Sequence, residues 1–204
     1  MNSTVTSLRA WLARPLELIN TNYGTHRGYI RHVLGQLEGV LGPRDRFRRI
    51  DPAKVQRLVF VCLGNINRSA FAHAVAAAGK ARCASIGLST STGARATEIA
   101  RTIAPEHGIS LDVHRATDIS AFERQEGDLL LVMELRHAHR LVARGVPEGQ
   151  IALLGHWARP VRYHIHDPQT LSVDYFRSCF TVIESATRRL VAELQVGDSP
   201  STRP

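Results

Sequence analysis

The fold is decided by the stretch Leu58-Val59-Phe60-Val61-Cys62-Leu63-Gly64-Asn65-Ile66-Asn67-Arg68-Ser69-Ala70. Its apolar beginning predicts a buried strand over 58–61, and its alanine-rich continuation predicts a helix over 69–79. The loop between them begins at Cys62 and is closed by an arginine and a serine. A loop at a helix N-terminus has spare backbone N–H groups, and the helix dipole there favours negative charge. The stretch therefore predicts an anion-binding loop with a cysteine at its base.

Strand and helix patterns continue to alternate after this stretch. Further strands are predicted over 82–86, 128–133 and 150–154, and further helices over 94–107, 134–144 and 173–194. This alternation predicts an α/β fold, a single domain with a four-stranded parallel sheet covered by helices on both faces. Ligands of such sheets bind beyond the carboxyl ends of the strands, where the loop after Cys62 is expected to lie.

The residues before the alternation predict an N-terminal helical extension. The boundaries are an extension and linker over 1–56, a main domain over 57–196 and a disordered tail over 197–204. In the extension, Thr25 is suited to cap a helix whose apolar side chains, from Ile30 to Leu41, recur every three or four residues. Such a helix needs a partner surface, and packing on the main domain is the first expectation. A homodimer through these helices, or binding to a membrane surface, is left open.

The composition is that of an ordinary globular protein. The chain has 204 residues, of which 44% are hydrophobic and 22% charged, and a formal net charge of +8. The positive charge favours anionic partners, but no nucleic-acid-binding signature accompanies it, so no nucleic-acid partner is expected. No apolar run is long enough to cross a bilayer and no secretory signal is evident, so a cytoplasmic location is expected. Three cysteines are too few for a disulfide framework, and no histidine belongs to a metal-ligand pattern.

Cys62 and Arg68 are the residues that predict chemistry. Spare backbone donors and the helix dipole favour the thiolate, which is the reactive form of a cysteine. The guanidinium group of an arginine matches two oxygens of a phosphate. A lone cysteine after an apolar strand is more often a small core residue, and Cys83 and Cys179 are interpreted as buried, inert thiols. The arginine, the glycine–asparagine pair and the helix that follows favour a nucleophile at Cys62 instead.

The spacing of Cys62, Gly64-Asn65 and Arg68-Ser69 resembles a known loop. In the low-molecular-weight protein tyrosine phosphatases this loop reads Cys-x-Gly-Asn-x-Cys-Arg-Ser-Pro. The resemblance extends from Arg57 to Leu194 and leaves residues 1–56 outside it. Further similar motifs are Ser85-Ile86-Gly87, His107-Gly108-Ile109, His114-Arg115-Ala116, Val132-Met133-Glu134 and Asp167-Pro168. The resemblance implies hydrolysis of phosphotyrosine or other aryl phosphate monoesters, with no metal or cofactor.

The resemblance also implies catalytic roles. Cys62 attacks phosphorus and forms a cysteinyl phosphate, and Arg68 binds two phosphoryl oxygens. Asp167 protonates the leaving oxygen and later takes a proton from the attacking water. The phosphate-binding residues are expected to be Leu63, Gly64, Asn65, Ile66, Asn67, Arg68 and Ser69.

Supporting roles are implied for four residues around the loop. Ser69 is expected to donate a hydrogen bond to the nucleophilic sulfur, which favours the thiolate. Ser85 is a candidate partner that fixes the Asn65 side chain. Gly64 and Asn65 suit a loop that needs positive φ, because these residue types tolerate it best.

Two residues depart from the family pattern. Asn67 stands where the family has a second cysteine, which can form a reversible disulfide with the nucleophile. Without that cysteine, Cys62 is predicted to oxidise more readily to sulfenic acid and beyond. Gln169 stands where the family has an aromatic residue that packs on the substrate ring, which leaves the preference for phosphotyrosine open. Tyr163 and Tyr175 are candidates to supply a ring instead.

Two other functions fit parts of the pattern. Some arsenate reductases share the loop and the fold, but they use two further cysteines close together in sequence, and Cys83 and Cys179 lie far apart. A non-catalytic regulatory protein would bind phosphate through the loop and act through the N-terminal helices. This second alternative is less favoured because a nucleophile, an arginine and a candidate acid are all present.

Overall fold

The computed structural model describes residues 50–194, together with residues 17–18, 20–25, 28–30, 33–34 and 47. Its sheet consists of β1 (Arg57–Cys62), β2 (Cys83–Gly87), β3 (Asp128–Val132) and β4 (Ile151–Leu153). All neighbouring strands are parallel, in the order β2-β1-β3-β4. The predicted four-stranded parallel sheet is confirmed. Cys62 pairs with Gly87 at the carboxyl ends of β1 and β2.

The helices of the main domain are α3 (Arg68–Ala78), α4 (Glu98–Ile103), α5 (Leu135–Val142) and α6 (Val173–Leu194). Short 3-10 turns occupy Pro52–Lys54, Ala104–His107, Ile119–Ala121, Glu148–Gln150 and Leu154–His156. The helix predicted over 94–107 is shorter than expected. It begins after Thr97, whose hydroxyl accepts a hydrogen bond from the Ala100 N–H, and it passes into a 3-10 turn at Pro105. Proline has no N–H with which to continue the α-helical ladder.

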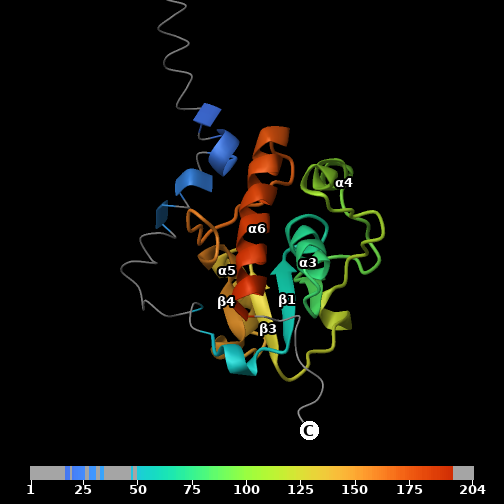
Figure 1. Cartoon of the computed structure of the whole chain (residues 1–204), viewed down its shortest axis with the longest axis vertical. Helices are drawn as coiled ribbons and strands as arrows, with labels where there is room; N and C mark the ends of the chain where they lie inside the picture. Colours follow the sequence, from blue (N-terminus) through green and yellow to red (C-terminus); the bar gives the residue numbers. More distant parts are fainter. Residues whose placement is uncertain are drawn as a thin grey trace, which may run out of the picture.

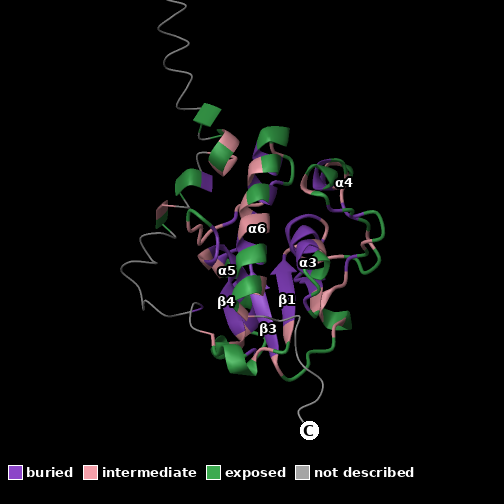
Figure 2. Cartoon of the chain, viewed as in Figure 1, coloured by how far each residue is buried: buried purple, intermediate pink, exposed green. Residues whose placement is uncertain are grey.

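Helices cover both faces of the sheet, as predicted. On one face, Leu58 and Phe60 of β1 belong to a buried cluster with side chains of α3 and α6. On the other face, Val59 and Val61 belong to a second cluster with side chains of α5. Figure 1 shows α6 passing in front of the strands, and Figure 2 shows that the strands are buried beneath the helices. Among the described helices, none is both long enough and apolar enough to traverse a lipid bilayer.

The described N-terminal residues are helical on either side of a turn at residues 24–25. Thr25 caps the second helical stretch, since its hydroxyl accepts a hydrogen bond from the Gly28 N–H at 2.9 Å. The expected burial of the apolar stripe is wrong for Ile30 and Leu34, which are 55% and 57% exposed. The stripe residues Leu37, Val40 and Leu41 and the tail 197–204 lie outside the described residues. The proposed domain boundaries stay a prediction.

Candidate active site

The loop that follows β1, here called the phosphate loop (residues 62–69), is supported by the chain that follows β2. The Leu88 N–H donates to the Cys62 carbonyl oxygen at 3.0 Å, and the Ser89 N–H donates to the Leu63 carbonyl oxygen at 2.9 Å. Gly87 permits this close approach, because a Cβ there would lie 3.0 Å from the Leu63 oxygen and 2.7 Å from Cγ2 of Thr90. The phosphate loop is therefore held to β2 by its backbone.

The Cys62 sulfur is buried and has two hydrogen-bond partners within the phosphate loop. The Ser69 hydroxyl lies 3.0 Å from the sulfur, and the Asn65 backbone N–H donates to it at 3.2 Å. Asn65 Nδ2 donates to the Ser69 oxygen at 2.9 Å, which leaves the hydroxyl hydrogen of Ser69 available for the sulfur. Donors that point at the sulfur stabilise its negative form. The contact expected of Ser69 is present in the structure.

The Asn65 side chain is fixed by other residues than the sequence suggested. Its Oδ1 accepts a hydrogen bond from the Thr117 backbone N–H at 2.9 Å, and its Nδ2 donates to Ser69. The role suggested for Ser85 is therefore filled by Ser69 and Thr117. Ser85 itself lies on β2, where it pairs with Phe60 of β1. Asn65 has the expected positive φ, 50°. The expectation for Gly64 is wrong, since it is not among the described residues with positive φ.

Arg68 is buried, with 1% of its side chain exposed, and its guanidinium group is held from two directions. Nη1 donates to Glu134 Oε1 at 2.6 Å and to the Ile165 carbonyl oxygen at 2.9 Å. Nη2 forms an ion pair with Asp167 Oδ2 at 2.8 Å, and Nε is buried with no hydrogen-bond partner among the described residues. Burial disfavours the charge, but Asp167, Cys62 and Glu134 outweigh it and raise the pKa of Arg68 above its usual value. Arg68 is charged, and its Nε–Nη2 edge has the donor spacing that two phosphate oxygens require.

Glu134 is the main residue of the site that sequence reasoning missed. It follows β3 directly, and its buried carboxylate contacts Arg68, Arg136 Nε at 2.9 Å and His164 Nδ1 at 3.6 Å. Burial disfavours its negative charge, but Arg68, His164 and His137 outweigh burial and lower the pKa of Glu134 to about 2. An acidic residue at the carboxyl end of a fully buried strand, beside the strand that carries Cys62, was the signal for it. Glu134 therefore orients the guanidinium group through its Nη1 atom.

Asp167 lies on the same pocket as Cys62 and Arg68. The pocket has a volume of about 160 Å³ and is lined by Cys62, Leu63, Gly64, Ile66, Asn67, Arg68, Ser89, Asp167 and Gln169. The Asp167 side chain is 29% exposed, whereas those of its neighbours Arg68 and Glu134 are almost fully buried. The structure thus brings together the residues predicted as nucleophile, phosphate-binding arginine and general acid, although about a hundred positions separate the first from the last.

The two departures from the family pattern touch one another at the pocket mouth. Asn67 Nδ2 donates to Gln169 Oε1 at 2.7 Å, and the Thr97 hydroxyl donates to Asn67 Oδ1. This chain of hydrogen bonds joins the phosphate loop, the residues after Asp167 and the N-terminus of α4. Among the described residues that line the pocket, none is aromatic, so none replaces the ring that Gln169 lacks. Tyr175 is buried and its hydroxyl donates to the His166 carbonyl oxygen, and neither it nor Tyr163 lines the pocket.

Cys83 and Cys179 are free thiols away from the pocket lining. Burial raises the pKa of Cys83 to about 11 and that of Cys179 to about 12, so both are protonated at neutral pH. Neither is a ready partner for Cys62, which weighs against the arsenate reductase alternative. Among the described residues, no group of three His, Cys, Asp or Glu side chains is placed to hold a metal ion.

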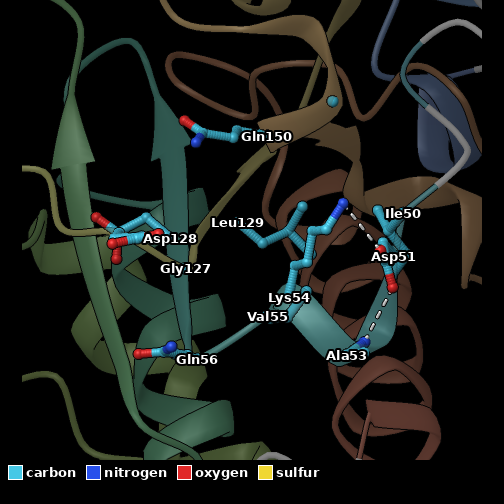
Figure 3. A pocket seen from close by; sticks show the side chains of 12 residues that line it. Ile50, Asp51, Ala53, Lys54, Val55, Gln56, Gly127, Asp128, Leu129 and Gln150 are labelled. Carbon is cyan, nitrogen blue, oxygen red and sulfur yellow. Dashed lines mark hydrogen bonds and ion pairs between the residues drawn. The ribbon is translucent and has the colours of Figure 1, made fainter.

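A second pocket, of about 340 Å³, lies at the opposite ends of the strands (Figure 3). It is lined by Gly127 and Asp128 at the start of β3 and by Lys54 and Asp51 before β1. Two of its charged groups are paired, Asp51 with Lys54 at 3.2 Å and Asp128 with Arg57 at 2.7 Å, and Glu126 in its lining is exposed. The candidate active site is the pocket at Cys62, because that pocket brings a cysteine, an arginine and an aspartate together.

A sequence model of the family described as low molecular weight phosphotyrosine protein phosphatase matches residues 57–199. The chain belongs to this family. One relative, the probable low molecular weight protein-tyrosine-phosphatase AmsI of Erwinia amylovora, is 37% identical over 144 residues, which are 69% of this chain and 98% of the relative. The crystal structure of the Erwinia amylovora tyrosine phosphatase AmsI has a TM-score of 0.60 and 32% identity, covering 68% of this chain and 93% of its own.

The structure of the tyrosine phosphatase Wzb from Escherichia coli K30 in complex with sulphate is similar to the same extent. Its TM-score is 0.61 at 32% identity, and the alignment covers 69% of this phosphatase and 99% of Wzb. Family membership confirms the predicted family, fold class and enzyme class. The N-terminal extension lies outside the residues that the family model matches.

Acid is expected to destabilise this phosphatase through His137 and Glu134. Burial lowers the pKa of His137 to about 3, so between about pH 6.5 and 3 the unfolded chain binds a proton there that the folded chain does not. The free energy of unfolding therefore falls as the pH falls through that window. The pKa of Glu134, lowered from 4.5 to about 2, adds a second loss below about pH 4.5. Urea unfolding between pH 7 and 4.5 measures the slope.

The His137→Gln variant is expected to flatten this slope between pH 6.5 and 4.5. His139→Gln, an exposed histidine on the same helix, is the matched control and is expected to leave the slope unchanged. An unchanged slope in His137→Gln would contradict the assignment.

Proposed function

We propose that this phosphatase hydrolyses phosphotyrosine and other aryl phosphate monoesters through a cysteinyl phosphate on Cys62, without a metal ion. The observation that carries the proposal is the pocket at the end of β1. One small cavity is lined by Cys62, Arg68 and Asp167. Among the described residues, the arginine Nε has no hydrogen-bond partner, and the neighbouring Nη2 pairs with the Asp167 carboxylate. A phosphate dianion would replace that carboxylate on Arg68.

In the first step, the Cys62 thiolate attacks phosphorus, and the bond between phosphorus and the aryl oxygen breaks. Backbone N–H groups of residues 63–68 and the Arg68 guanidinium hold the phosphoryl oxygens as their charge shifts. Once phosphate binds Arg68 in place of the carboxylate, Asp167 acts in its protonated form as the general acid. Its proton goes to the leaving oxygen, so the product departs as a neutral phenol.

In the second step, water attacks the phosphorus of the cysteinyl phosphate, and the bond between sulfur and phosphorus breaks. Asp167, now ionised, accepts the proton of the attacking water. The Ser69 hydroxyl, 3.0 Å from the sulfur, stabilises the thiolate that leaves. Inorganic phosphate is released and Cys62 is ready for another cycle.

Replacing Asp167 with asparagine tests the role of the acid. We expect kcat/KM for phenyl phosphate to fall by about 10²- to 10³-fold, because phenolate is a poor leaving group without a proton. The fall for p-nitrophenyl phosphate should be smaller, since p-nitrophenolate leaves readily without one. Both assays contain EDTA. Equal losses on the two substrates would argue against Asp167 as the general acid.

Gln169 is proposed to limit selectivity for aromatic substrates, because its side chain is bonded to Asn67 at the mouth. Gln169→Tyr is expected to raise kcat/KM for a phosphotyrosine peptide over a phosphoserine peptide by about 3- to 10-fold, through ring packing. Gln169→Leu is the matched control, since it removes the hydrogen bond without adding a ring. An unchanged ratio in Gln169→Tyr would contradict this role.

The partners and location follow from the chemistry. A phosphotyrosine-containing protein is the proposed substrate, and the cytoplasm is the proposed location because a working thiolate needs a reducing compartment. A homodimer through the N-terminal helices stays a proposal. It is supported by the exposed apolar side chains of Leu18, Ile30 and Leu34, and sedimentation of the full chain tests it.

A further inference from the structure

The N-terminal extension contacts the segment that carries Asp167. The contact is made by the N-terminal turn, defined as residues 22–25 together with residue 28. Arg162 Nη1 donates to the Asn22 carbonyl oxygen at 3.1 Å, and the guanidinium carbon of Arg162 lies 4.6 Å from the centre of the Tyr23 ring. Figure 1 shows the blue N-terminal residues beside the orange chain that leads into α6. A part of the chain outside the family match thus lies against the chain that leads to Asp167.

Two glycines allow the backbone of the N-terminal turn to approach closely. Gly24 has a φ of 76°, and a Cβ there would lie 2.5 Å from Leu171 Cδ1 and 2.9 Å from Tyr175 Cδ1. Gly28 is buried, and a Cβ there would clash with the Tyr23 carbonyl oxygen within the turn and lie 3.1 Å from His166 Cδ2. The side chains that these glycines face are those of His166, directly before Asp167, and of Leu171 and Tyr175, shortly after it. A larger residue at position 24 would have to displace the side chains of Leu171 and Tyr175.

The segment around Asp167 also contacts the phosphate loop. We call residues 165–171 the acid segment. The Ile165 carbonyl oxygen accepts from Arg68, the Ile165 N–H donates to the Met133 carbonyl oxygen at 2.9 Å, and Gln169 accepts from Asn67. The acid segment contains no helix or strand of its own. Its position therefore depends on contacts with its surroundings. The phosphate loop lies on one side and the N-terminal turn on the other, and α6 adds the hydrogen bond from the Tyr175 hydroxyl to the His166 carbonyl oxygen.

We infer that the N-terminal turn is a positioning element for the general acid. By packing on the acid segment, the N-terminal turn holds that segment beside the phosphate loop. Asp167 is thereby kept within hydrogen-bond distance of the leaving oxygen. This inference rests on the proposed role of Asp167. A displaced acid segment weakens protonation of the leaving group, but it leaves the Cys62 nucleophile and its hydrogen bonds intact. Small displacements of a catalytic group are enough to slow the step that the group assists.

The test compares leaving groups in Gly24→Ala. We expect kcat/KM for phenyl phosphate to fall by about 10-fold and that for p-nitrophenyl phosphate to fall by less than about 2-fold. Gly145→Ala is the matched control. Gly145 has a nearly identical φ of 79°, but a Cβ there would meet no atom within 4 Å. The control should therefore share the backbone strain and leave both rates unchanged.

Combination with Asp167→Asn separates positioning from general damage. If the N-terminal turn acts through Asp167, Gly24→Ala should cause no further loss of phenyl phosphate hydrolysis in the Asp167→Asn background. Equal losses on both substrates, or the same loss in both backgrounds, would overturn the inference. If Asp167→Asn lowers kcat/KM for phenyl phosphate and Gly24→Ala does not, the positioning role of the N-terminal turn is overturned and the role of Asp167 is retained. No effect of Asp167→Asn overturns the proposed acid itself.

Arg162→Ala gives an independent test that introduces no clash. It removes the hydrogen bond to Asn22 and the contact with the Tyr23 ring, so it loosens the N-terminal turn from the chain three residues before the acid segment. It should shift the two substrates in the same direction as Gly24→Ala, with a loss of about 3- to 10-fold confined to phenyl phosphate. Thermal unfolding of each variant identifies any that fail to fold. A folded Arg162→Ala with wild-type selectivity between the two substrates would contradict the inference.

Discussion

The Cys62→Ser variant is expected to lose at least about 10⁴-fold in kcat for p-nitrophenyl phosphate. The sulfur has two hydrogen-bond donors, the Ser69 hydroxyl and the Asn65 N–H, at 3.0 and 3.2 Å. These donors stabilise a thiolate, but they do not make a serine hydroxyl ionise near neutral pH. The described residues that line the pocket also include no histidine that would take a proton from a serine hydroxyl at position 62. Steady-state assays at saturating substrate measure the loss.

Cys83→Ser is the matched control for this variant. Cys83 begins β2 and does not line the pocket, so its replacement is expected to keep activity within about 2-fold of the wild type. Acid quenching of the wild type during turnover, followed by peptide mass spectrometry, should locate a phosphoryl group on Cys62. Comparable activity in Cys62→Ser and the wild type would rule out the cysteinyl phosphate.

The sheet and the phosphate loop were predictable because their signals are local. Each strand is an apolar run within a few residues, and the parallel order follows from the helices between them. The phosphate loop brings Cys62, Asn65, Arg68 and Ser69 together within eight consecutive positions. Contacts between residues so close in sequence can be predicted without knowing how distant segments of the chain are placed.

The partners of the phosphate loop were not predictable in the same way. Thr117, Glu134 and Ile165 reach it from three different connections, and their positions depend on the register of β1 with β2 and β3. A pattern in one sequence does not specify such a register residue by residue. The suggested partner Ser85 illustrates this, because the Asn65 amide is hydrogen-bonded to Ser69 and to the Thr117 N–H instead.

The N-terminal extension illustrates a different limit. Its period-3.6 apolar pattern predicted helix correctly at the described positions, but not the surface that the helix contacts. Among the described residues from 17 to 34, contacts with the main domain are made by Asn22, Tyr23, Gly24 and Gly28, at and beside a turn. They are polar, aromatic or small, and none belongs to the apolar stripe. Amphipathic periodicity identifies the apolar face of a helix. The contact with the main domain depends instead on the close approach of the backbone at Gly24 and Gly28 and on Arg162.

Arg68→Lys is expected to lower kcat/KM for p-nitrophenyl phosphate by about 10²- to 10³-fold, although the positive charge is retained. The three nitrogens of the guanidinium group have different surroundings. Nη1 is committed to Glu134 and the Ile165 carbonyl oxygen, Nη2 binds Asp167, and Nε is buried without a partner among the described residues. A lysine has one nitrogen. It either pairs with the buried Glu134 or turns to the phosphate, and it does not present two parallel donors.

Arg136→Lys is the control that separates this geometry from charge alone. Arg136 also contacts the Glu134 carboxylate, but its side chain is 50% exposed and it does not line the pocket. We expect Arg136→Lys to retain activity within about 2-fold. Competitive inhibition by inorganic phosphate gives a second measurement, and Arg68→Lys should weaken it while Arg136→Lys should not. If Arg68→Lys binds phosphate and turns over as well as Arg136→Lys, then a single charge suffices at position 68, and the two-donor edge of the arginine is not what holds the phosphoryl group.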